Sequence, residues 1–136
     1  MINFNYETDF KLEDETKVSN WISSAILNEN CKEGELNYIF CDDTYLHQLN
    51  VEFLNHDTLT DIISFDYSVG KELHGDIYIS VERVADNAKD FQVLFNDELH
   101  RVIIHGILHY CGYKDKTETD AKTMRLKEDY YLNTLN

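Results

Sequence analysis

The sequence contains no proline and only three cysteines, Cys31, Cys41 and Cys111. The number is odd and none lies in a CxxC pattern, so we expect free thiols in a reducing compartment, with little support for a thiolate metal site. No apolar run approaches the roughly 20 residues that cross a bilayer. The first ten residues, MINFNYETDF, lack the basic and apolar segments of a signal peptide. These absences favour a cytoplasmic protein that contacts no membrane.

Positive charge is also scarce. The chain has 12 Lys and Arg against 26 Asp and Glu, a formal net charge of −14. A uniformly acidic surface repels phosphate backbones, so the composition excludes nucleic-acid binding through bulk positive charge. Activity on RNA would instead require a metal ion, a few local cations or a partner that delivers the substrate.

The length of 136 residues fits one domain with its own hydrophobic core. No repeat, linker or low-complexity segment divides the chain, so we expect one domain over residues 1–136. The apolar patterns favour an α+β fold: a single compact domain with a four-stranded sheet flanked by about five helices. The predicted strands cover residues 2–6, 36–41, 62–67 and 75–80, with a turn at 32–35. The predicted helices cover residues 14–30, a segment capped by Asp43 or Thr44, residues 81–91 after Ser80, a segment from Asn96 or Asp97 to Gly112, and a segment from Thr117 to about Leu135.

The segment HGILHYCGYKD, residues 105–115, places two histidines on one face of a mostly apolar helix. Residues four apart have Cβ atoms about 5–6 Å from each other, so His105 and His109 can chelate one ion. Gly112 can end the helix in a left-handed conformation and return Asp115 to the same ion. The pattern HxxxHxxGxxD matches the metzincin layout, with Asp as the last ligand and Gly106 in place of the catalytic glutamate. The alternative is a buried helix whose histidines are structural.

Five segments occur in the order and spacing of one family: LN (49–50), TDIISF (60–65), HGDIYIS (74–80), ELHRVIIHGILHYCGYKD (98–115) and MRLKED (124–129). In these segments the chain resembles the YbeY family of bacterial ribosomal-RNA maturation factors. The resemblance implies a mixed sheet flanked by helices, a zincin-like metal helix and one bound zinc ion. It also implies a zinc-dependent endoribonuclease specific for single strands, which acts in 3′-end maturation of small-subunit ribosomal RNA and in ribosome quality control. The implied partners are single-stranded RNA, ribosomal RNA and ribosomal proteins.

The sequence departs from the family motif HGxLHLxGYDH at two positions of this segment. His105 and His109 match the first two metal ligands, whereas Asp115 stands in place of the third histidine and Lys114 in place of the preceding acid. A carboxylate oxygen is an ordinary zinc donor, so the resemblance still implies a site of His105, His109 and Asp115. The family's substrate arginine corresponds to Leu54. The candidates for contact with substrate are therefore other residues: Arg101, Lys116 and Ser64, with His56 and Arg83 as further possible cations.

Because Gly106 cannot act as a base, another acid must do so. Asp76, at the start of a predicted strand, and Glu98, on the metal face of the helix, are the catalytic candidates. Glu98 can instead accept a proton from a ligand imidazole, and Asp76 can instead be a turn-capping acid. The last helix is predicted to pack through its apolar residues and to expose its charged ones, Glu128 among them.

Two other functions fit the same residues. A zinc peptidase agrees with the metzincin-like layout but lacks the adjacent glutamate. A ribosome-associated factor without catalytic activity would keep zinc for stability only.

Overall fold

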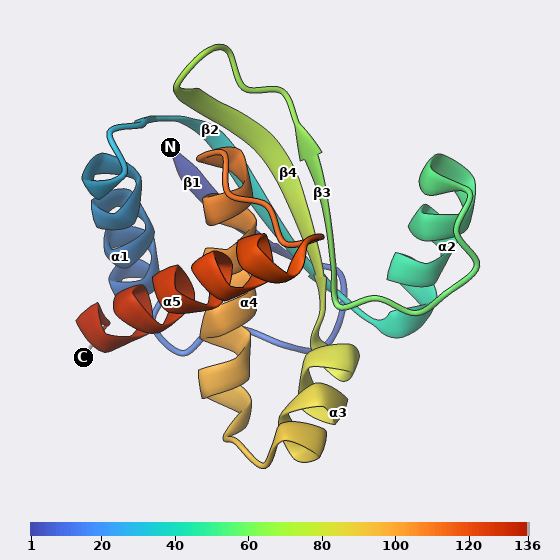
Figure 1. Cartoon of the computed structure of the whole chain (residues 1–136). Coiled ribbons are helices and arrows are strands. Elements are labelled where there is room, and N and C mark those ends of the chain that lie inside the picture. Colours follow the sequence, from blue (N-terminus) through green and yellow to red (C-terminus); the bar gives the residue numbers. More distant parts are fainter. Residues whose placement is uncertain (136) are drawn as a thin grey trace.

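A computed structural model describes residues 1–135, which form one four-stranded mixed sheet with helices on both faces (Figure 1). The strand order is β1-β2-β4-β3, in which β1, β2 and β4 are parallel and β3 is the antiparallel edge strand. The predicted α+β class with a mixed four-stranded sheet is confirmed. The strands are β1 (Ile2–Tyr6), β2 (Lys32–Cys41), β3 (Ile62–Asp66) and β4 (Glu72–Ser80).

Five helices cover the sheet unevenly. Helices α1 and α4 pack on one face and α5 packs across α4, while α2 lies over the other face and projects from the body of the molecule (Figure 1). None of the helices in the described part of the chain has the length and apolarity that a membrane span requires. The helices are α1 (Glu15–Asn28), α2 (Asp43–Leu54), α3 (Val81–Phe91), α4 (Phe95–Tyr110) and α5 (Glu118–Thr134).

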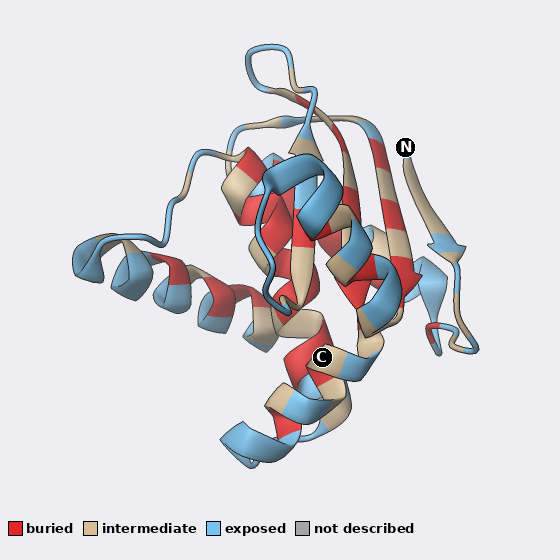
Figure 2. Cartoon of the chain, turned by 90° about the vertical axis from the view of Figure 1, so that its right-hand side faces the viewer, coloured by how far each residue is buried: buried red, intermediate tan, exposed pale blue. Residues whose placement is uncertain are grey.

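The core lies between the sheet and α4, where buried residues concentrate (Figure 2). Alternate residues of β2 and β4 point toward α4 because side chains along a strand alternate between faces. Helix α4 packs closely at Gly106, where a Cβ atom would stand 3.2 Å from side-chain atoms of Ile62 and Ile77. The Tyr38 hydroxyl donates to the Ile103 carbonyl at 2.8 Å and joins sheet to helix. Helix α4 is therefore held rigidly at the centre of the domain. The fully buried side chains at this interface include Tyr38, Phe40, Ile77, Ile79, Ile103, Ile104, Ile107 and Leu108.

Several predicted boundaries need correction. Residues 32–35 are not a turn but the start of β2, which pairs with β4 through an irregularity between Glu33 and Leu36. The cap of α2 is Asp42, whose side chain accepts from Tyr45 N. The predicted caps of α4, Asn96 and Asp97, lie inside the helix, which begins at Phe95. The residue before it, Leu94, provides no side-chain cap. There the Phe95 ring packs against Phe10 at 6.0 Å, so tertiary packing sets the start of α4. Predicted N-caps Ser80 and Thr117 are confirmed.

Candidate metal centre

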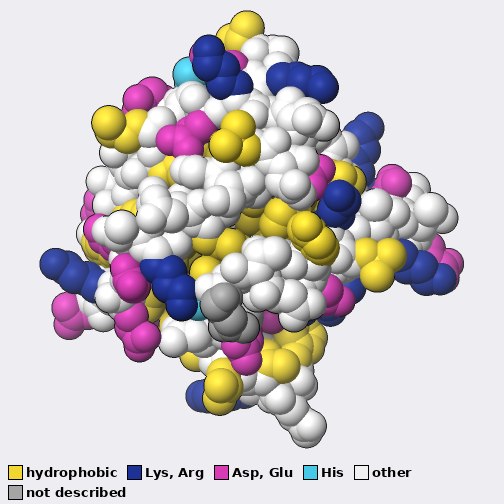
Figure 3. Space-filling model, turned by 90° about the vertical axis from the view of Figure 1, so that its left-hand side faces the viewer, with side chains coloured by type: hydrophobic (Ala, Val, Ile, Leu, Met, Phe, Trp, Pro, Cys, Tyr) yellow, Lys and Arg dark blue, Asp and Glu magenta, His cyan; other side chains and the backbone are white. Residues whose placement is uncertain are grey.

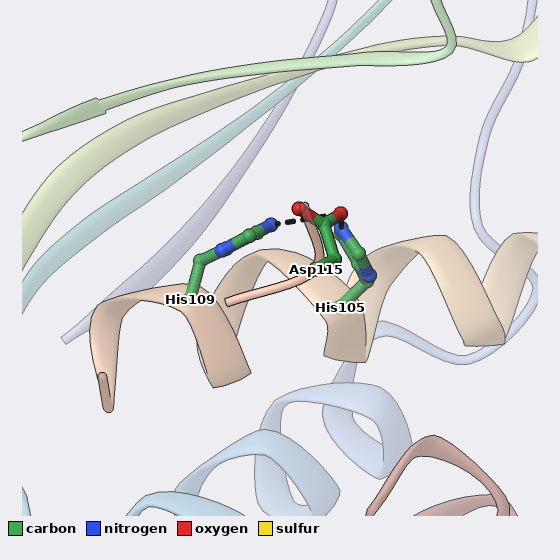
Figure 4. Close-up of side chains that lie close together, drawn as sticks. All are labelled: His105, His109 and Asp115. Atoms are coloured by element: carbon green, nitrogen blue, oxygen red, sulfur yellow. Dashed lines mark ion pairs between the residues drawn. The ribbon is translucent and has the colours of Figure 1, made fainter. Parts of the chain in front are cut away.

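Helix α4 carries His105 and His109 one turn apart, with ring centroids 4.5 Å from each other. The helix ends at Tyr110, two residues earlier than predicted, and Gly112 has φ of +107°. That conformation is in the region that favours glycine, and it reverses the chain so that Asp115 returns over the helix (Figure 4).

The three side chains meet at one point. One carboxylate oxygen of Asp115, Oδ2, lies 3.2 Å from His105 Nε2 and 3.5 Å from His109 Nε2. One ligand atom from each of the three residues lies within 4.8 Å of the other two. The geometry thus brings together the three residues that the sequence indicated as metal ligands.

Hydrogen bonds at the far nitrogen of each ring decide which nitrogen carries a proton. His109 Nδ1 lies 3.0 Å from the Tyr113 carbonyl oxygen, which can only accept, so Nδ1 carries the proton. His105 Nδ1 lies 2.7 Å from Glu128 Oε2, where a carboxylate accepts in the same way. In neutral rings both Nε2 lone pairs then point at the Asp115 oxygen. Three electron-pair donors that converge without a proton between them fit a cation such as Zn²⁺.

Glu128 was missed as a site residue, and its prediction as an exposed charge is wrong. It comes from α5, is 5% exposed and binds both the His105 ring and the Arg101 guanidinium, the latter at 2.9 Å. The spacing of Met124, Glu128 and Tyr131, four and three residues apart, places all three on the buried face of α5. That periodicity was a usable signal for Glu128.

The environment of His105 favours its protonated form when no metal is present. Burial lowers the pKa of His105, but the hydrogen bond and charge of Glu128, helped by Asp115, outweigh burial and raise it above the ordinary value. The same negative potential attracts a metal cation.

Arg101, a predicted substrate contact, is occupied within the protein. Its guanidinium binds Glu128 and, at 2.7 Å, Asp129, and its side chain is only 22% exposed. It stabilises the buried Glu128 carboxylate and has little freedom to bind a phosphate.

Glu98 faces a small cavity of about 250 Å³ beside the candidate centre. It is 6% exposed and, within residues 1–135, does not hydrogen-bond to either ligand imidazole. The partner of His105 is Glu128 instead. Burial raises the pKa of Glu98, and the nearby Asp61 carboxylate raises it further, against the opposing charge of Arg101.

The structure does not bring Asp76 to the centre. Successive residues of a strand point to opposite faces of the sheet. The neighbours of Asp76, Gly75 and Ile77, face α4, so the Asp76 side chain lies on the opposite face. There it accepts from Asn37 Nδ2 at 3.0 Å. The strand register turns Asp76 away from the candidate centre, so its position does not favour a role as the base there.

Ser64 and Lys116 both line a groove of about 590 Å³ between the end of α2, the loop that follows it and β3. Ser64 is on the sheet face that carries α4, since its antiparallel partner is the buried Ile77. Lys116 follows the candidate ligand Asp115 directly. The groove thus brings two predicted substrate contacts together, and one of them, Lys116, is the neighbour in sequence of a candidate ligand. Its remaining lining residues are Asn50, Leu54, His56, Thr58, Leu59, Thr60, Ile62 and Ile63.

Basic side chains do not gather on the face of the molecule formed around α1 and α5. On that face, Figure 3 shows Lys and Arg side chains dispersed among acidic and apolar ones. The arrangement agrees with the overall charge of −14, which excludes attraction of RNA through bulk charge.

The fold and the site together define a single-domain α+β protein with a candidate metal centre at the end of a buried helix. A family model described as Endoribonuclease YbeY matches residues 2–136, and the chain belongs to the YbeY family. The resemblance in its motifs is confirmed.

Relatives of known name agree with this assignment. The chain is 67% identical to Endoribonuclease YbeY of Flavobacterium johnsoniae over 129 residues, which cover 95% of this chain and 93% of that protein. It is 52% identical to Endoribonuclease YbeY of Karelsulcia muelleri over 132 residues, or 97% and 94% of the two chains. The solution structure of TM1509 from Thermotoga maritima has a TM-score of 0.71 at 25% identity, over 99% of this chain and 89% of that one.

Proposed function

We propose that this protein is a zinc-dependent endoribonuclease specific for single-stranded RNA. Its place would be in the cytoplasm, in 3′-end maturation of small-subunit ribosomal RNA and in ribosome quality control, with ribosomal components as partners. The observation that carries the proposal is the convergence of two imidazole lone pairs and one carboxylate oxygen at the end of α4. The endoribonuclease names of its relatives supply the substrate class.

His105, His109 and Asp115 would hold the zinc ion. A zinc ion held by these three residues would supply Lewis-acid chemistry, that is, activation of water and stabilisation of negative charge on phosphoryl oxygens. Glu128 and the Tyr113 carbonyl fix the proton on each Nδ1, so that both Nε2 atoms remain free to bind. One carboxylate in the ligand set leaves one net positive charge at the zinc.

Lys116 would contact an RNA phosphate, and Ser64 would contact the same strand within the groove. The two arginine candidates are occupied: Arg101 binds two acids of α5, and Arg83 binds Asp43 at 2.7 Å. His56 lines the same groove as Lys116. Lys116 forms no ion pair with any other described residue and is exposed beside the centre. A free cation beside the centre compensates locally for an acidic protein.

A zinc peptidase receives less support from the structure. Position 106 would have to carry the catalytic glutamate of the metzincin layout, yet Gly106 faces the sheet with Ile62 and Ile77 closely packed on it. A longer side chain there would point into the core, away from the ligands.

The test uses purified protein of measured zinc content with single-stranded RNA, duplex RNA and an unstructured peptide. We expect cleavage of single-stranded RNA, loss of zinc and cleavage in His109→Ala and Asp115→Ala, and retention of zinc in Asp115→His. Full zinc content in Asp115→Ala would refute the ligand set. Peptide cleavage would establish the peptidase, and bound zinc without any cleavage would establish a structural role.

A further inference from the structure

The cavity beside the candidate metal centre contains carboxylates that neither belong to the ligand group nor bind its imidazoles. About 250 Å³ in volume, it is lined by four carboxylates, those of Asp61, Glu98, Asp115 and Glu128, together with Arg101 and His105. Asp115 is a candidate zinc ligand and Glu128 binds His105 and Arg101. Asp61 and Glu98 have no part in either arrangement.

Glu98 is a buried acid without a partner. It is 6% exposed, and its carboxylate forms no hydrogen bond or ion pair with any of residues 1–135. Its carboxylate opens into the cavity, and a charged group that the fold encloses is normally paired or binds a metal. Arg101, the nearest cation on the cavity wall, already binds Glu128 and Asp129.

Asp61 faces the same cavity from the loop before β3. Its backbone carbonyl accepts from Ser80 N at 3.0 Å, which fixes the loop against the end of β4. Among the described side chains, only the amide of Asn87, at 3.5 Å, donates a hydrogen bond to its carboxylate. The backbone N–H groups of Asp61 and Ile62 also stabilise it. Asp61 and Glu98 line the same cavity, where the charge of Asp61 raises the pKa of Glu98. The fold thus holds two carboxylates together without a cation between them.

The charge of the cavity indicates what is missing. With all four carboxylates ionised, the four acids and one guanidinium leave three negative charges when His105 is neutral. Burial, which raises the pKa of both Asp61 and Glu98, works against this state unless a cation is bound. A zinc ion on His105, His109 and Asp115 would leave one negative charge, which still repels a phosphate. A second divalent cation would make the cavity positive.

We propose that Asp61 and Glu98 bind a second divalent cation, Mg²⁺ or Mn²⁺, beside the His105–His109–Asp115 group. These ions prefer oxygen ligands and are commonly held by one or two carboxylates, with water and substrate phosphates completing the shell. The ligand chemistry differs from the imidazole-rich zinc group, so the two sites select different metals. Its role, which rests on the proposed function, is to hold a phosphate oxygen of the RNA next to the zinc group.

The test is a titration of zinc-loaded protein with Mn²⁺, without RNA, in which electron paramagnetic resonance measures free Mn²⁺. We expect one Mn²⁺ per wild-type chain with zinc retained. Glu98→Gln and Asp61→Asn should weaken Mn²⁺ binding by about tenfold or more at unchanged zinc content. Glu118→Gln, whose side chain is 89% exposed, is the matched control and should bind Mn²⁺ as the wild type does.

Absence of Mn²⁺ binding to the zinc-loaded wild type would overturn the second site, as would equal binding by Glu98→Gln. Both amide variants keep the shape of the acid, and thermal unfolding verifies that they fold. The experiment also separates this proposal from the function. Mn²⁺ bound through Glu98 in a protein that cleaves no RNA would support the second cation site and reject the proposed nuclease function. RNA cleavage without Mn²⁺ binding would support the nuclease function and reject the second site.

Discussion

The role of Glu128 can be tested by Glu128→Gln, which removes the charge of the side chain and keeps its volume. The carboxylate accepts from His105 at 2.7 Å and from Arg101 at 2.9 Å, and it is 5% exposed. Glutamine can accept only one of these bonds well. If the single amide oxygen accepts from Arg101, no acceptor fixes the His105 proton on Nδ1, and the lone pair at Nε2 is no longer held toward the metal.

The magnitudes follow from these contacts. Loss of a buried, charge-assisted hydrogen bond costs about 1.5–3 kcal/mol. The free energy of unfolding of the metal-free variant should therefore be lower than that of the wild type by about this amount. Loss of a residue that orients a metal ligand costs about 10–100-fold in metal affinity. The assays are urea unfolding of the metal-free protein and competition for zinc with a chromogenic chelator.

Asp129→Asn is the control, because Asp129 binds the same Arg101 but does not touch His105. Its side chain is 50% exposed, so its loss should cost at most about 1 kcal/mol and leave zinc affinity unchanged. If Glu128→Gln binds zinc as tightly as the wild type, or if Asp129→Asn loses zinc to the same extent, the proposed orientation of His105 by Glu128 is wrong.

Three further predictions concern other parts of the chain. Lys116→Glu should weaken binding of single-stranded RNA and reduce the slope of log affinity against log salt. Lys114→Glu should change the affinity and the slope less. Equal effects of the two variants in a fluorescence anisotropy titration would contradict a specific phosphate contact. Asp76→Asn should leave zinc content and RNA cleavage within about twofold of wild type, because the side chain lies across the sheet; a large loss of cleavage would show that Asp76 acts in the site. Burial lowers the pKa of His100 below its ordinary value, so the folded state favours the neutral ring. The resulting stability is present above about pH 6.5 and is lost as pH falls toward the folded pKa. His100→Gln should therefore lose less stability than the wild type between pH 7 and pH 5 in denaturant unfolding.

The candidate ligands could be predicted from the sequence because their arrangement is local. The helical period places His105 and His109 on one face, and Gly112 supplies the reversal that returns Asp115 within a few residues. Helix ends set by side-chain caps, such as those at Ser80 and Thr117, were predictable for the same reason. The start of α4 was not, since it depends on a contact of Phe95 with a residue far along the chain.

By itself, therefore, the sequence determined the α+β class, the family and the three residues that converge at the end of α4. Only the tertiary structure decided which acids lie beside these three residues and hydrogen-bond to them. Packing of α5 across α4 brings Glu128 onto His105, 23 residues away, and engages Arg101. The register of β4 turns Asp76 to the far side of the sheet. Periodicity is encoded in neighbouring residues, whereas the face of a sheet or the partner of a buried acid depends on contacts between distant segments.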